Sequence, residues 1–96
     1  MSERQGRYRV KADANQAEIV QALQAAGYRV FDTHAVGHGF PDLCVQAGSG
    51  AIILLEVKGP RGTLTPDEVE FFTEWRESPI YWVRTAEDAL SLCRRR

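Results

Sequence analysis

Residues 42–58, which read DLCVQAGSGAIILLEVK, decide the fold. Two largely apolar segments, 42–47 and 51–57, flank the sequence GSG, which is typical of a turn between antiparallel strands. The second segment is apolar at both alternating sets of positions until Glu56, which predicts a central strand covered on both faces. An acidic residue in such a buried strand needs a physical reason.

The turn also predicts which residues of the two strands face each other. A symmetric three-residue turn pairs Ala47 with Ala51, and counting outward then places Asp42 opposite Glu56. Opposed side chains have Cβ atoms about 4.5 to 5.5 Å apart, and like charges at that spacing are destabilising unless a cation compensates. Lys58 lies two residues after Glu56, so strand alternation places its ammonium group on the same face.

Two carboxylates beside an amine suggest metal-assisted chemistry. Mg²⁺ or Mn²⁺ suits such oxygen ligands and binds through one or two carboxylates together with substrate phosphate. Water on the ion would be the nucleophile, and Lys58 would orient it or stabilise charge on the phosphate. The alternative is a set of ion pairs on an exposed sheet face, which contribute about 0 to 1 kcal/mol each.

Helices and further strands are expected around this hairpin, in the order α-β-β-β-α-β-α. Thr65-Pro66-Asp67-Glu68 is a strong helix start, with a capping box between Thr65 and Glu68. The expected helices are 13–26, 66–77 and a last one after Thr85, and the further expected strands are 28–33 and 80–84. This order predicts an α/β fold with a mixed central sheet flanked by helices.

The composition predicts one domain. The chain has 96 residues, of which 44% are hydrophobic and 26% charged, so we expect a basic arm at 1–12 and a single domain at 13–96. The formal net charge of -1 excludes a wholly basic nucleic-acid coat. We expect a cytoplasmic protein without a signal peptide or membrane span, and we interpret Cys44 and Cys93 as structural.

The pattern Pro41-Asp42 followed by Glu56-Val57-Lys58 resembles the PD-(D/E)xK nuclease signature. Within that superfamily the chain is most similar to the VRR-NUC family, the virus-type replication-repair nucleases, over about 15–90. The matching positions are Glu18, Gly39-Phe40-Pro41-Asp42-Leu43, Glu56-Val57-Lys58-Gly59-Pro60 and Leu64-Thr65-Pro66. This extent suggests a stand-alone form of bacterial or viral origin.

The resemblance implies a restriction-endonuclease-like α-β-β-β-α-β core with a C-terminal helix and a magnesium- or manganese-dependent DNA endonuclease. Some family members cut branched DNA, and stand-alone forms resemble dimeric Holliday-junction resolvases of DNA repair. It implies that Asp42 and Glu56 hold the metal together with the backbone carbonyl of Val57. Lys58 would assist the nucleophile, and Glu18 would reach the metal from the first helix.

Three further residues are candidate DNA contacts. Arg61 follows Lys58 closely and suits a phosphate, and the loop at 34–40 contains His38 and Gly39, where glycine lets a backbone approach DNA closely. A plain flexible loop is the alternative. The glycines also argue against a helical zinc site formed by His34 and His38, and the 58–63 segment lacks the ending of a nucleotide-binding loop.

Two features leave alternatives open. The VRR-NUC family commonly has Gln at the position of Glu68, where an acid would repel phosphate, recruit a second metal or only complete the capping box. Val69, Phe72 and Trp75 form a helical stripe expected to pack in the core, with a self-association surface as the second interpretation. A non-catalytic DNA-binding or assembly module, or a plain interaction domain, is therefore the alternative to an enzyme.

Overall fold

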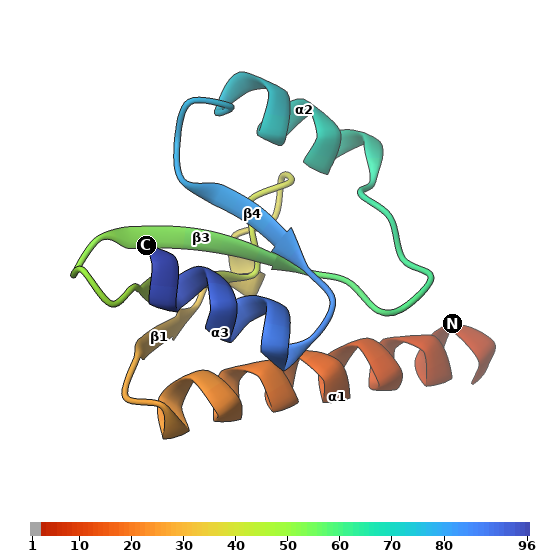
Figure 1. Ribbon diagram of the computed structural model, residues 1–96. Helices are drawn as coiled ribbons and strands as arrows, with labels where there is room; N and C mark the ends of the chain where they lie inside the picture. The colour runs from red at the N-terminus through yellow and green to blue at the C-terminus, as the bar shows by residue number, and fades with distance from the viewer. Residues whose placement is uncertain (1–2) are drawn as a thin grey trace.

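The computed structural model describes the backbone of residues 3–96 and the side chains of residues 14–96. It is an α/β fold with a four-stranded mixed sheet and three α-helices (Figure 1). The elements are α1 (Glu3–Ala25), β1 (Arg29–Asp32), the 3-10 helix η1 (His34–Val36), β2 (Leu43–Gln46), β3 (Ile52–Val57), α2 (Pro66–Glu74), β4 (Ile80–Val83) and α3 (Ala86–Arg95). The predicted order of helices and strands is confirmed, with η1 as an addition.

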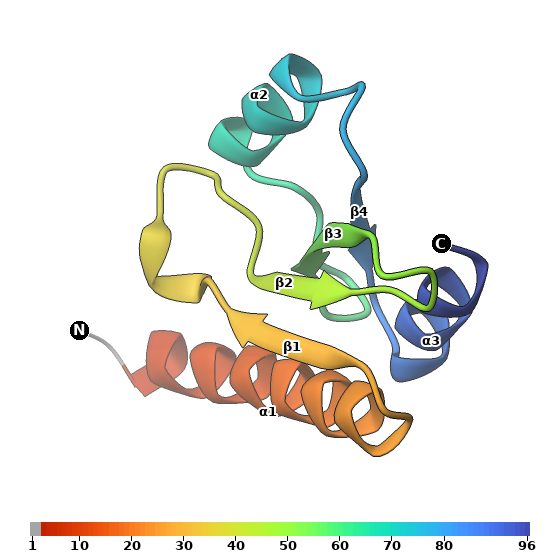
Figure 2. The same ribbon diagram turned by 90° about the vertical axis from the view of Figure 1, so that its left-hand side faces the viewer.

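The sheet has the strand order β1-β2-β3-β4. β2 runs antiparallel to both β1 and β3, whereas β4 runs parallel to β3. α1 and α3 cover one face of the sheet, and α2 lies on the other side (Figures 1 and 2). Among the helices of the described chain, none is long and apolar enough to cross a bilayer.

The hairpin register is the one that the turn predicts. Leu43 pairs with Leu55, and Gln46 pairs with Ile52. Within the turn, the Ala47 amide donates to the Ala51 carbonyl at 2.8 Å, and the Gly50 amide donates to the Ala47 carbonyl at 2.9 Å. Extending the same register by one pair brings Asp42 opposite Glu56.

The core lies between the sheet and the helices α1 and α3. Its buried members are Ile19, Leu23, Leu43, Val45, Ala47, Ile53, Leu55, Val83, Ala89, Leu92 and Cys93. The members from β2 and β3 are all odd-numbered, so strand alternation sends Asp42, Glu56 and Lys58 to the opposite face. Burial also raises the pKa of the Cys93 thiol, in keeping with a structural role for this cysteine.

The first helix begins earlier than we expected. It starts at Glu3 rather than at Asp13, so residues 3–12 form its first turns. The reason is that this segment has no proline and consists mostly of residues that tolerate a helix, with Gly6 as the weakest. The basic side chains predicted for an N-terminal arm, Arg4, Arg7, Arg9 and Lys11, lie outside the described side chains.

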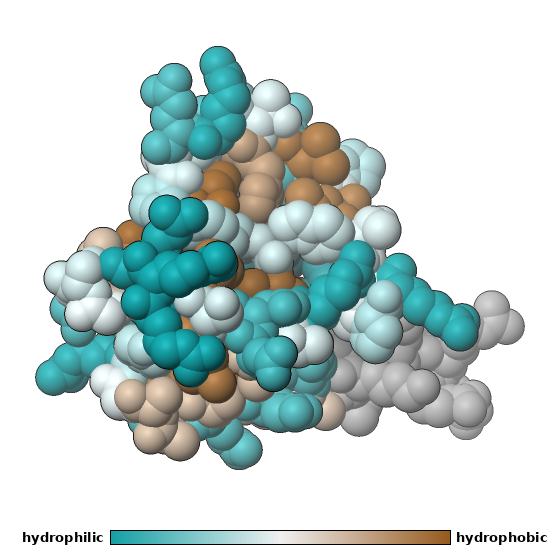
Figure 3. All heavy atoms as spheres, viewed as in Figure 1, coloured by the Kyte–Doolittle hydropathy of each residue, from teal (hydrophilic) through white to brown (hydrophobic). Residues whose placement is uncertain are grey.

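Two predictions about burial were wrong. Helix α2 has no buried residue, and the side chains of Val69 and Trp75 are 49% and 52% exposed. The helix instead forms a local aromatic cluster, in which Phe71 stacks on Trp75 and meets Phe40 edge-on, each pair with ring centroids 5.4 Å apart. Hydrophobic side chains are accordingly visible at the surface around α2 (Figure 3).

Strand β3 is likewise covered on both faces only in part. Ile52 at its start is 63% exposed, whereas Leu55 and Glu56 near its end are buried. The β1–β2–β3 face is left open near Ile52 because α2 lies toward the other end of the sheet (Figure 2). Burial on the second face is therefore concentrated at the end of β3 that carries the acidic residue.

Candidate functional site

Asp42, Glu56 and Lys58 come together on the face of the sheet that α2 partly covers. Asp42 directly precedes β2, Glu56 lies in β3, and Lys58 directly follows β3. A fourth charged residue, Glu68 in the first turn of α2, joins them. The site therefore contains three carboxylates and one amine.

The Asp42 carboxylate is held from two sides. Its Oδ2 accepts a hydrogen bond from the Val57 backbone amide at 2.9 Å. Its Oδ1 lies 3.5 Å from His34 Nδ1, and its backbone carbonyl accepts from the Thr33 amide at 2.8 Å. The side chain thus bridges the hairpin at the position where the two acidic residues face each other.

Glu56 has the most unusual environment of the residues in the site. It is only 2% exposed, and its Oε1 has no hydrogen-bond partner within the described residues. Burial first, and then the negative charge of Asp42, raise the pKa of Glu56 to about 10. A buried carboxylate with a free oxygen is destabilising unless it is protonated or meets a cation.

Lys58 lies between two carboxylates. Its Nζ is 2.7 Å from Glu68 Oε1 and 3.6 Å from Glu56 Oε2. Burial opposes its charged form, but Glu68 and Glu56 outweigh burial, so the pKa of Lys58 is raised. The Lys58 side chain therefore carries a fixed positive charge at neutral pH.

Glu68 has two roles in the structure. Its Oε1 also accepts from the Thr65 amide at 2.8 Å, and Thr65 Oγ1 accepts from the Glu68 amide, which completes the predicted capping box. Burial would raise the pKa of Glu68, but Lys58 and the Thr65 amide outweigh it and lower that pKa. The capping box thus holds an ionised carboxylate against Lys58.

Asp42 and Glu56 are the two residues of the site that could serve as ligands to a divalent cation. Among the described side chains, no group of three or more His, Cys, Asp or Glu is arranged to hold a metal. Two carboxylates with water and phosphate are what Mg²⁺ or Mn²⁺ commonly takes. The free Oε1 of Glu56 is the atom that a cation would satisfy.

Of the other predicted site residues, Val57 contacts Asp42, whereas Glu18, Arg61 and His38 are exposed. Glu18 is exposed on α1, which packs against the opposite face of the sheet, and is not part of the cluster. Arg61 and His38 are exposed, His38 with a positive φ of 58°. The amide of Val57 is engaged by Asp42.

Gly39 lies in close contact with the backbone of α2. A Cβ atom at Gly39 would lie 2.5 Å from the Asp67 carbonyl oxygen, and its φ is +81°. Glycine at this position lets the loop before Asp42 lie against the first turn of α2, beside Glu68. The loop thereby connects two parts of the site.

Gly39→Ala is expected to lower the free energy of unfolding by about 2 to 4 kcal/mol, because it adds a backbone clash to the strain of a positive φ. Chemical denaturation measures this difference. Gly27→Ala is the matched control, since Gly27 has a φ of +94° and a methyl group added there would have no atom within 4 Å. An equal loss in both variants would contradict the close contact at Gly39.

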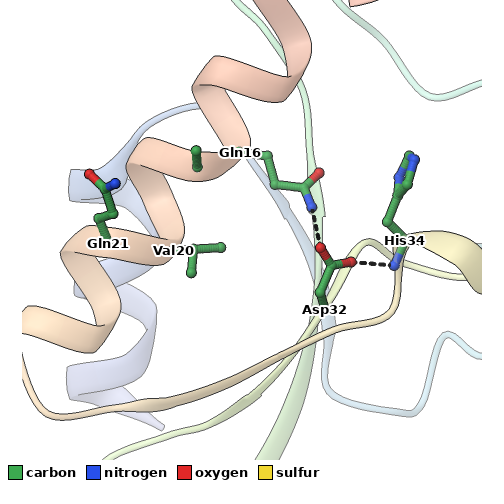
Figure 4. A pocket seen from close by; sticks show the side chains of 6 residues that line it. Gln16, Val20, Gln21, Asp32 and His34 are labelled. Atoms are coloured by element: carbon green, nitrogen blue, oxygen red, sulfur yellow. Dashed lines mark hydrogen bonds between the residues drawn. The ribbon is translucent and has the colours of Figure 1, made fainter. Parts of the chain in front are cut away.

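A pocket of about 370 Å³ lies between α1, Asp32 at the end of β1 and His34 of η1 (Figure 4), and His34 also contacts Asp42. Asp32 accepts from the His34 amide at 2.7 Å and from Gln16 Nε2 at 3.5 Å. Gln16 and Asp32 were not predicted from the sequence to belong to a site, and His34 was considered as a zinc ligand, which the glycines argue against, and as part of the loop at 34–40. Gln16 reaches Asp32 of β1, but a single polar residue in a helix gave no sequence signal for such a contact.

Comparisons of the chain with protein-family models, with curated proteins and with solved structures give no match.

Proposed function

We propose that this protein is a magnesium- or manganese-dependent DNA endonuclease of the PD-(D/E)xK type, similar to the VRR-NUC family. The observation that carries the proposal is the buried Glu56 carboxyl group, whose Oε1 has no hydrogen-bond partner within the described residues and whose Oε2 lies 3.6 Å from Lys58 Nζ. The α-β-β-β-α-β order with a C-terminal helix fits the restriction-endonuclease-like core that this type of enzyme has.

Each residue has a role in this proposal. Asp42 and Glu56 would hold the ion, which when bound supplies an activated water and stabilises phosphate charge. Lys58 Nζ keeps a proton and places a positive charge next to the carboxylates, where it stabilises charge on the phosphate. Arg61 follows Lys58 by three residues and is exposed to solvent; in this proposal it contacts a DNA phosphate.

The proposed substrate is branched DNA, such as a Holliday junction. The sequence contains no recognised base-reading motif, so binding is expected to follow the shape and backbone of the DNA. A dimer would match the two-fold symmetry of a four-way junction. These expectations identify the DNA structures that an assay needs to compare.

The test incubates the protein with labelled four-way junction, flap, linear duplex and single-stranded DNA in Mg²⁺ or Mn²⁺. Cleavage in metal and none in chelator supports the enzyme, and the fastest substrate identifies the preferred DNA structure. Absence of cleavage on every substrate, with DNA binding retained, contradicts the enzyme.

The alternative is a non-catalytic DNA-binding or assembly module with the same fold. The 2.7 Å ion pair between Lys58 and Glu68 favours it, because the pair neutralises the ammonium group that a phosphate would meet. The two functions differ in the cleavage assay, since the module would bind DNA without cutting it.

Glu68→Gln is expected to tighten DNA binding about 5-fold at low salt, equivalent to about 1 kcal/mol, because it frees the Lys58 charge. Gln retains the capping box, so the fold is preserved. Fluorescence anisotropy in chelator measures the Kd without cleavage. Glu70→Gln removes an exposed charge from the same helix and is the control; equal tightening in both variants would show that the Lys58 pair is irrelevant.

A further inference from the structure

The segment that follows the catalytic candidate Lys58 is fixed from the first helix. Asn15 Nδ2 donates to the Lys58 carbonyl at 3.1 Å and to the Arg84 carbonyl at 3.2 Å. The Lys58 amide in turn donates to the Val83 carbonyl at 3.0 Å. One amide group of α1 therefore ties together the ends of the parallel strands β3 and β4.

Arg84 holds the turn that comes next. Its Nη1 donates to the Gly59 carbonyl at 2.6 Å and to the Gly62 carbonyl at 2.8 Å. Arg84 is itself fixed, because Asp88 Oδ2 accepts from its amide at 3.1 Å and its guanidinium lies 4.9 Å from the Trp82 ring centroid. The Arg84 guanidinium group thus binds the backbone of the protein itself.

The turn forms a wall against the Lys58 side chain. The Gly62 amide donates to the Gly59 carbonyl at 3.1 Å, which closes the turn. A Cβ atom at Gly62 would lie 3.5 Å from both Cβ and Cδ of Lys58. Movement of the turn would therefore change the space available to the side chain that carries the ammonium group.

We propose that Asn15 and Arg84 are positioning residues, which hold residues 58–62 so that the Lys58 ammonium group faces the acids and Arg61 faces the substrate. This inference rests on the proposed nuclease function. It assigns different roles to Arg84 and Arg61: Arg84 binds the protein backbone, whereas Arg61 is exposed to solvent, where it could contact DNA. Lys in place of Arg84 would keep the charge but lose the paired contact with two carbonyls.

The first test measures cleavage kinetics of Asn15→Ala and Arg84→Lys in Mn²⁺. Arg76→Lys is the control, because the Arg76 guanidinium donates to the nearby Thr73 carbonyl at 2.9 Å. Misplaced catalytic groups lower kcat, so we expect kcat of both variants to be about 10- to 100-fold below that of wild type, with KM within about 3-fold of the wild-type value. A raised KM with unchanged kcat would overturn the inference and identify Arg84 as a DNA contact.

The second test does not depend on DNA cleavage. Trypsin cuts after Arg61, and mass spectrometry follows the cut between Arg61 and Gly62 in the folded protein. We expect this cut to be about 10-fold faster in both variants, because an untied turn opens more often; Asn15→Ser provides a second variant if Asn15→Ala does not fold. Unchanged cutting overturns the inference. If trypsin cuts the variants faster but the wild-type protein cleaves no DNA, then Asn15 and Arg84 do hold the turn, and the proposed nuclease function is overturned.

Discussion

Replacing Asp42 with Asn is expected to lower the rate of DNA cleavage about 10³-fold, or about 4 kcal/mol in the activation barrier. Asn has nearly the same shape, and its side-chain oxygen can still accept from the Val57 amide. The change therefore removes the negative charge and leaves the bridge across the hairpin. Initial rates on the preferred DNA substrate in Mn²⁺ measure the effect.

The matched control for this variant is Asp67→Asn, which removes one negative charge from an exposed position of α2. Equal unfolding midpoints of the two variants would show that the fold is retained. A cleavage rate for Asp42→Asn within about 10-fold of wild type would contradict a metal-holding role, since about 1.4 kcal/mol is less than a lost ligand should cost.

Glu56→Gln is expected to abolish cleavage and, in chelator, to stabilise the protein by about 2 kcal/mol or more at pH 8. The physical reason is the raised pKa of Glu56, about 10 in the folded protein. Because folding favours the protonated acid, its stabilising contribution is complete below the ordinary pKa of Glu and is lost as pH rises toward 10. Gln has no proton to lose.

Thermal unfolding between pH 7 and 9 measures this difference. Wild type in chelator should lose up to about 1.4 kcal/mol per pH unit relative to Glu56→Gln. Adding Mn²⁺ should stabilise wild type more at pH 9 than at pH 7, because the ion competes with the Glu56 proton. If the stabilities of wild type and Glu56→Gln change with pH in the same way, both with and without Mn²⁺, then Glu56 neither titrates between pH 7 and 9 nor binds the ion.

The hairpin and its acidic pair were predictable from the sequence because strand alternation and a three-residue turn leave one register. Asp42 and Glu56 are close along the hairpin, so no information about distant contacts was needed. The capping box of α2 was predictable for the same reason, since Thr65 and Glu68 interact within one turn of helix.

Contacts between distant segments were not predictable. The pairing of Glu68 with Lys58 and the bonds of Arg84 to Gly59 and Gly62 depend on how α2 and β4 pack on the hairpin. The aromatic stripe gave the wrong expectation because its spacing indicates an apolar face but not whether the sheet extends far enough to bury it. The role expected for Glu18 depended on the resemblance, and its exposed position on α1 offers no geometric support.

Helix α2 covers the site without a single buried residue of its own. Elements with so little buried surface open at a small fraction of the free energy needed to unfold the whole domain. When α2 moves away from the sheet, Glu68 separates from Lys58 and water reaches Glu56. The resting protein should therefore alternate between two states. In one, Glu68 neutralises the Lys58 ammonium group; in the other, that group is unpaired and Glu56 can ionise. Amides of α2 are therefore expected to exchange with solvent deuterium well before those of β2 and β3.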